Sequence, residues 1–164
     1  KPLAFSAFLS VQNLTGIYSP FTVEANYNQD MTPYNIPFTA CHELSHLRGV
    51  MQEEEANFIA WLACKDAPET ELQYSGSMLA WIHCMNVLYE EDRAAWSEIR
   101  EILSEEADVD LRENSKFWDK WDGAVAEVSE QINDNYLKAN GQKDGVQSYG
   151  RMADLVVAYY LWEE

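Results

Sequence analysis

The chain has 164 residues, of which 47% are hydrophobic and 13% are aromatic, so it is long and apolar enough to bury one core. Aspartate and glutamate number 28 against 11 lysines and arginines, which gives a net charge of −17. This balance argues against a nucleic-acid partner, because phosphates demand a basic surface, and against docking to anionic lipid. The acidic charge suits cationic substrates, but solubility is the simpler explanation for it.

No internal repeat or linker divides the sequence, so we expect one domain over residues 1–164. No apolar run approaches the roughly 20 residues that a membrane helix needs, so from the sequence we expect neither a membrane span nor a signal peptide in this segment. Because the first residue is Lys1, we expect the chain to be a domain excised from a longer protein.

The N-terminal region predicts a small amount of β-structure. Residues Lys1–Ser10 are apolar and suit either a short helix or a strand. Residues Thr22–Asn28 alternate between apolar and polar side chains, which is the pattern of a half-buried strand. Pro33 and Pro37 bracket a loop that leads into the next helix, and Pro37 suits the first turn of that helix.

The segment Cys41–Cys64 holds the most informative pattern, which opens with the motif H-E-x-x-H. Positions four apart share one face of a helix, so His42 and His46 can point two imidazoles at one zinc ion. Glu43 follows the first histidine, where it can hold and deprotonate a water on the metal. Gly49 suits the C-terminal cap of this helix. The alternative interpretation is an amphipathic helix that carries two incidental histidines.

A second predicted helix, from Gln52 to Cys64, can supply the third ligand that a catalytic zinc site needs. We expect this ligand to be Glu53, with Glu54 as the next choice and Glu55 less suited to face the metal. Asn57 shares a face with Glu53, so its amide can hydrogen-bond the far nitrogen of a ligating histidine and fix the tautomer. An acidic run alone is usually a solvated face, but its position after H-E-x-x-H favours the metal interpretation.

The rest of the chain predicts further helices. Residues Glu69–Glu90 are apolar on nearly every face, which indicates a buried helix in which His83 is a core residue and not a ligand. Three more apolar faces follow, in a helix around Trp96–Leu103, a long periodic segment over Leu111–Tyr136, and a last helix over Ser148–Trp162.

The three cysteines lie in apolar helical contexts, so we expect buried free thiols and no disulfide framework. They are Cys41, Cys64 and Cys84. Cys41 adjoins His42 in the sequence, but it falls on a different face of the helix from the two histidines.

The motif H-E-x-x-H followed by Glu-x-x-x-Asn resembles the gluzincin metallopeptidases, whose third zinc ligand is that glutamate. Asn57 stands where many gluzincins have aspartate, so it brings an acceptor without a charge. More closely, the chain is similar to a bacterial membrane-protein family, domain of unknown function 3810. The similarity covers most of the chain and is carried by Tyr18–Thr22, Pro37–Cys64, Tyr74–Gly76, Tyr136–Gln142 and Gln147–Tyr149. It implies a zinc peptidase in which His42, His46 and Glu53 bind the metal.

The resemblance to gluzincins implies two further features. Such enzymes often stabilise the oxyanion with a tyrosine, histidine or arginine well downstream of the metal motif, and our candidates are Tyr149 and Arg151, followed by Tyr74. A strand edge beside the metal helix binds the substrate backbone, and we assign this role to Thr22–Asn28. Each of these residues also suits a purely structural role.

We therefore expect a predominantly helical α+β domain with a gluzincin-like active-site helix and a small N-terminal sheet. The expected function is hydrolysis of peptide bonds in a peptide or protein substrate, with one Zn²⁺ per chain and Glu43 as general base. The main alternative is a non-catalytic zinc-containing domain that binds a peptide or partner, and a third is a helical interaction module without metal. The family resemblance implies a parent protein anchored in a membrane by upstream segments, with this domain outside the cytoplasm.

Overall fold

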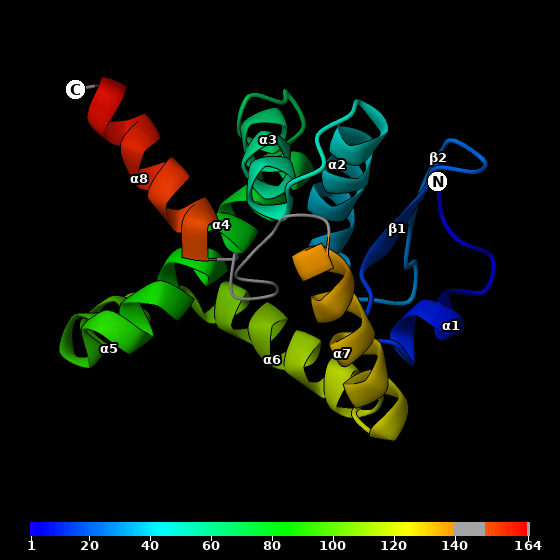
Figure 1. The fold of residues 1–164 in the computed structure, drawn as a ribbon. Coiled ribbons are helices and arrows are strands. Elements are labelled where there is room, and N and C mark those ends of the chain that lie inside the picture. Colours follow the sequence, from blue (N-terminus) through cyan, green and yellow to red (C-terminus); the bar gives the residue numbers. More distant parts are fainter. Residues whose placement is uncertain (140–149, 164) are drawn as a thin grey trace.

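The computed structural model describes residues 1–139 and 150–163 of the chain. Within these ranges, a two-stranded sheet lies beside a group of packed helices (Figure 1). The elements are α1 (Ser6–Ser10), β1 (Gly16–Ser19), β2 (Glu24–Tyr27), α2 (Asn35–Leu47), α3 (Glu53–Lys65), α4 (Thr70–Glu91), α5 (Arg93–Glu101), α6 (Glu105–Asp119), α7 (Ala124–Ala139) and α8 (Gly150–Glu163). The predicted α+β class, mostly helical with a small N-terminal sheet, is confirmed.

The strand with a free edge in this sheet is β1 and not β2. The two strands are antiparallel, with Gly16 opposite Tyr27. On its other side, Tyr27 donates its N–H to the Lys1 carbonyl and accepts from the Leu3 N–H, both at 3.0 Å. Both edges of β2 are therefore engaged. The expectation that Thr22–Asn28 offers a free edge to a substrate is wrong, because an N-terminal segment pairs there.

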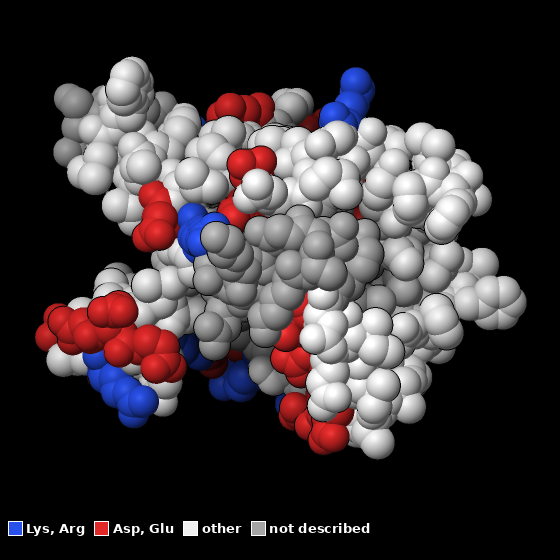
Figure 2. All heavy atoms as spheres, in the orientation of Figure 1, with Lys and Arg blue, Asp and Glu red and all other residues white. Residues whose placement is uncertain are grey.

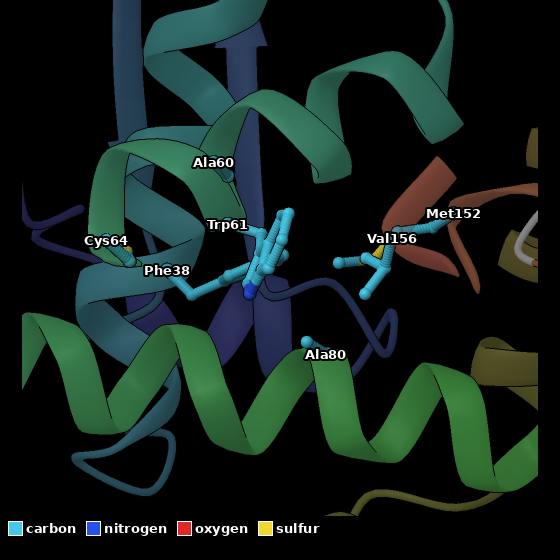
Figure 3. Packing of buried hydrophobic residues seen from close by; sticks show 7 residues of the cluster. All are labelled: Phe38, Ala60, Trp61, Cys64, Ala80, Met152 and Val156. Carbon is cyan, nitrogen blue, oxygen red and sulfur yellow. The ribbon is translucent and has the colours of Figure 1, made fainter. Parts of the chain in front are cut away.

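The core joins three consecutive helices to α8, which is distant from them in the sequence. Trp61 of α3 lies at its centre, with α2, α4 and α8 around it (Figure 3). The buried members of the cluster are Phe38, Ala60, Trp61, Cys64, Ala80, Met152 and Val156. Burial of these apolar groups fixes α2 against α3 and so determines where the ligand-type side chains of the two helices meet.

The predicted central helix over Glu69–Glu90 is confirmed as α4, which contacts α2, α3, α5 and α8. It approaches α3 closely because it has a glycine at the crossing point. A Cβ added to Gly76 would lie 2.5 Å from the Cβ of Cys64, well inside contact distance. His83 of α4 is half-buried, and not fully buried as expected of a core residue, and it is not part of the one group of ligand-type side chains that converges within the described ranges.

The long periodic segment over Leu111–Tyr136 is two helices and not one. α6 ends at Asp119 and α7 begins at Ala124, with Gly123 in the interval between them. Glycine is unfavourable inside a helix, and here its carbonyl accepts from the Glu127 N–H at 3.1 Å at the start of α7. The apolar period alone did not reveal the break, and the two helices use it differently: Leu111 of α6 packs against a buried cluster, whereas Val125 and Ile132 of α7 are exposed.

Acidic side chains are spread over the surface. On the face shown in Figure 2, they gather over α5 and beside α7 instead of forming one continuous patch. This distribution agrees with a role of the charge in solubility. None of the helices in the described ranges combines the length and the apolar character that a membrane span requires.

Candidate metal centre

Two helices bring three ligand-type side chains together. His42 and His46 lie on α2, and Glu53 is the first residue of α3, which packs against α2 (Figure 1). The His42 Nε2 is 3.0 Å from the His46 Nε2 and 3.2 Å from the Glu53 Oε2, and the His46 Nε2 is 3.5 Å from the Glu53 Oε1. Within the described ranges this is the one group of three or more such side chains whose ligand atoms converge.

These distances fit a tetrahedral zinc site. Two atoms that bind a tetrahedral zinc ion at about 2.0–2.1 Å lie roughly 3.3 Å apart, and the three observed separations scatter around that value. Two imidazole nitrogens and one carboxylate are also a donor set that zinc prefers at catalytic sites. The side chains are partly buried, which limits competition from water. The residues therefore fit the metal that the sequence predicts.

A backbone carbonyl holds His46 in the tautomer that a metal needs. The His46 Nδ1 is 2.7 Å from the Val50 carbonyl oxygen, which can only accept a hydrogen bond, so Nδ1 carries the proton. In the neutral ring the lone pair is then on Nε2, which faces Glu53 and His42. This is the arrangement in which zinc-ligating histidines are usually oriented, with the carbonyl in place of a side chain.

The end of α2 explains why the Val50 carbonyl lies there. Gly49 has φ of 95°, which is the left-handed conformation that favours glycine, and it ends the helix. The Val50 N–H donates to the Ser45 carbonyl at 3.1 Å, and the Gly49 N–H donates to the His46 carbonyl at 3.0 Å. These two bonds form a Schellman cap. The predicted cap at Gly49 thus also turns the chain back towards His46.

The predicted partner of the histidines, Asn57, is buried on α3. It does not bond to His46, whose Nδ1 is used by Val50. The His42 Nδ1 is buried and has no hydrogen-bond partner within the described ranges. The proposed contact between Asn57 and a ligating histidine is thus not formed here, and His42 keeps one polar atom that such a contact can satisfy.

The carboxyl groups of Glu43 and Glu53 have pKa values shifted in opposite directions. Burial raises the pKa of Glu43 to about 7, against the lowering effect of His42 and His46. Burial would also raise the pKa of Glu53, but hydrogen bonds from the two histidines outweigh it and lower the value to about 2. Glu53 is therefore ionised, as a ligand must be, whereas Glu43 can gain or lose a proton near neutral pH.

Strand β1 adds two residues that the sequence did not single out. The Tyr18 ring stacks near His46, with the ring centroids 6.5 Å apart. Gly16 lies so close to Glu43 that a Cβ on Gly16 would be 2.4 Å from the Glu43 Oε1. Gly16 lies outside the predicted strand Thr22–Asn28, so the sequence analysis had no strand in which this glycine could indicate a close approach.

The remaining predicted residues lie elsewhere or outside the described ranges. Glu54 is buried and pairs with Arg151 of α8 at 3.3 Å, so Glu53 and not Glu54 joins the histidines. The Tyr74 hydroxyl donates to Asp110 of α6 at 2.6 Å, which engages it away from this group. Tyr149 lies outside the described residues.

The fold and this cluster define a class: a mostly helical α+β domain with an H-E-x-x-H centre completed from the following helix. Residues 1–157 match the family described as Protein of unknown function (DUF3810), and the chain belongs to that family. No curated protein and no solved structure matches the chain. The predicted family is thus confirmed, and the similarity to gluzincin peptidases stays a prediction.

Proposed function

We propose that this domain is a zinc-dependent peptidase. The observation that carries the proposal is the convergence of His42, His46 and Glu53 at mutual distances of 3.0–3.5 Å, with the buried carboxyl of Glu43 on the same helix. A bound zinc ion would polarise the scissile carbonyl and make water more acidic. The other parts of the reaction fall to side chains and backbone of this chain.

Glu43 is the general base in this proposal. Its pKa of about 7 suits a group that takes a proton from water and returns it to the leaving amine at neutral pH. Gly16 packs against its carboxylate and limits the positions that it can adopt. The attacking water would be held between Glu43 and the histidine pair.

The edge of β1 is suited to hold an extended peptide. Because Tyr27 directs its N–H and C=O away from β1, its partner Gly16 directs its own backbone groups to the free edge, and so does Tyr18 two residues on. Within the described ranges these groups have no hydrogen-bond partner. A peptide paired with this edge would run past Glu43 and His46, which contact the same two residues.

We assign the donor to the oxyanion to Arg151 or to Tyr149. Arg151 is half-exposed at the start of α8 and bonds to Glu54, the neighbour of Glu53. Its place next to the ligand-bearing end of α3 supports a role in binding the developing negative charge. Tyr149, two residues earlier, remains the other candidate.

The test begins with the metal content of the purified domain, measured by mass spectrometry beside a His46→Ala variant. We expect about one zinc per chain, lost in the variant. A library of peptides should then be cleaved by the wild type, with cleavage stopped by a chelator and restored by zinc. His83→Ala is the matched control, because it removes a histidine outside the cluster.

Two outcomes would contradict the proposal in different ways. Absence of zinc after incubation with it would exclude the metal site and leave a helical interaction domain. Zinc with peptide binding but no chelator-sensitive cleavage would favour the alternative function, a non-catalytic domain that recognises a peptide or partner. The burial of Glu43 argues against that alternative, because a purely structural metal site does not require this carboxyl group.

A further inference from the structure

Two of the three thiols face each other across the helices that carry the ligand-type side chains. The Sγ of Cys41 on α2 and the Sγ of Cys64 on α3 are 3.8 Å apart, and both thiols are free. Cys41 directly precedes His42, and Cys64 lies on the same helix as Glu53. A bond between the two sulfurs would therefore join the two halves of the metal centre.

We propose that Cys41 and Cys64 are a redox-active pair, which a small-molecule disulfide converts to an intramolecular disulfide that ties α2 to α3. This inference concerns a covalent modification and does not depend on whether the domain binds zinc.

The burial of the two thiols sets their order of reaction. Cys41 is half-buried, so a small reagent can reach it, whereas Cys64 has an exposed fraction of 0%. Cys64 can thus react with its neighbour but not with a reagent in solution. The pair has the arrangement of an attacking thiol beside a resolving thiol.

The reaction is a balanced thiol–disulfide exchange. The Cys41 sulfur attacks one sulfur of the reagent, so that a mixed disulfide forms and the first small thiol leaves. The Cys64 sulfur then attacks the Cys41 sulfur, which forms the protein disulfide and releases the second small thiol. The two protons of the protein thiols end on the two released thiols. The protein loses two electrons and the reagent gains them.

The packing around the pair favours closure. The sulfurs must approach by less than ~2 Å to reach the S–S distance of about 2.05 Å. Cys64 cannot retreat, because its Cβ lies against α4 at Gly76, where an added Cβ would be 2.5 Å away. The half-buried Cys41 side chain makes the required movement. Cys84, the third thiol, lies on α4 and is the internal control.

The experiment treats the purified domain with oxidised glutathione and follows it by intact mass and by peptide mapping. It is run with a chelator and again with added zinc. We expect a product with a disulfide that links Cys41 to Cys64, and with Cys84, which is also half-buried, either unmodified or carrying glutathione but not joined to another cysteine of the chain. Dithiothreitol should reverse it. Cys84→Ser should behave as the wild type, and Cys64→Ser should stop at a glutathione adduct on Cys41.

Oxidation should also raise the unfolding temperature of the wild type by about 5 °C or more, since the bond restricts the unfolded chain, but not that of Cys64→Ser. A stable glutathione adduct on Cys41 of the wild type would overturn the proposal. A protein disulfide between Cys84 and either of the other two cysteines would also overturn it. So would the absence of any product from the folded domain under conditions in which the urea-unfolded chain reacts.

If the proposed zinc site is real, the disulfide should also slow the loss of zinc to a competing chelator, because it joins the helices of His42 and Glu53. This second measurement rests on the proposed function. The mass measurement does not, so a failure of the disulfide and a failure of the zinc site give different results.

Discussion

Gly16 of β1 and Glu43 of α2 are in direct contact. A Cβ at Gly16 would lie 2.4 Å from the Glu43 Oε1 and 2.7 Å from its Cγ. Only a residue without a side chain leaves the carboxylate where it is. The contact thus links β1, whose free edge suits a peptide, to the group that we propose as the general base.

Replacing Gly16 by alanine should therefore reduce peptide hydrolysis. The new methyl group would displace the Glu43 carboxylate by an ångström or so, which can cost on the order of 10²-fold in turnover. Zinc content should be unchanged, because the atoms nearest to the new methyl group belong to Glu43 and not to the three ligand-type side chains. Gly123→Ala is the control, since a Cβ there meets no atom within 4 Å. Equal turnover in both variants would remove Gly16 from the site.

The carboxylate of Glu43 should be needed for turnover and not for metal. Glu43→Gln keeps the shape of the side chain but cannot accept a proton, so we expect normal zinc content and loss of measurable hydrolysis. Metal analysis and peptide cleavage on one preparation test this. Full activity in the variant would exclude Glu43 as the base.

Gly49 should affect zinc affinity although it is not a ligand. Its φ of 95° lets the Val50 carbonyl return to the His46 Nδ1. Gly49→Ala would strain this turn by roughly 1 kcal/mol and loosen the carbonyl, and loss of such a partner typically weakens metal binding about 10- to 100-fold. A zinc titration against a competing chelator measures the effect. Val50→Ala, which keeps the carbonyl, should bind zinc as the wild type does.

Patterns confined to one helix or its ends could be predicted from the sequence. The H-E-x-x-H face and the cap at Gly49 follow from local spacing and appear in the structure, as does the next helix, predicted from Gln52 and observed from Glu53. The order of the helices from α2 onwards was predicted for the same reason, apart from the break between α6 and α7, whereas the segment of α1 was left open between helix and strand.

Features that depend on contacts between distant segments could not be predicted. The free edge was predicted on the segment of β2 but is found on β1, because Lys1 and Leu3 pair with Tyr27. This is a parallel pairing that no local pattern encodes. The partner of His46 is a backbone carbonyl, and any residue type carries one. The contact between Gly16 and Glu43 joins two elements whose relation is set by packing alone.

The close crossing of α3 and α4 gives a prediction about stability. Gly76→Ala would place a methyl group 2.5 Å from the Cβ of Cys64, and the neighbour is part of a helix that cannot move freely. Overpacking of this kind costs about 1–3 kcal/mol. Urea unfolding of Gly76→Ala beside Gly123→Ala tests it, and equal midpoints would show that the two helices separate easily.

The raised pKa of Glu43 predicts how the stability of the metal-free domain depends on pH. The folded state holds this proton up to about pH 7, whereas the unfolded carboxyl, at its ordinary value of 4.5, has already lost it. The folded state therefore binds more protons between these values, and stability falls as the pH rises through the window. The pKa shift corresponds to a loss on the order of 3 kcal/mol in the free energy of unfolding, and this loss stays constant above pH 7.

Glu43→Gln removes this contribution and leaves the other titrating groups in place. In the presence of a chelator, the variant should gain stability over the wild type as the pH rises from about 4.5 to 7, with no further gain above. Urea unfolding of both proteins at several pH values measures the difference. A difference that does not change with pH would mean that the Glu43 carboxyl titrates normally and is open to water in the folded domain.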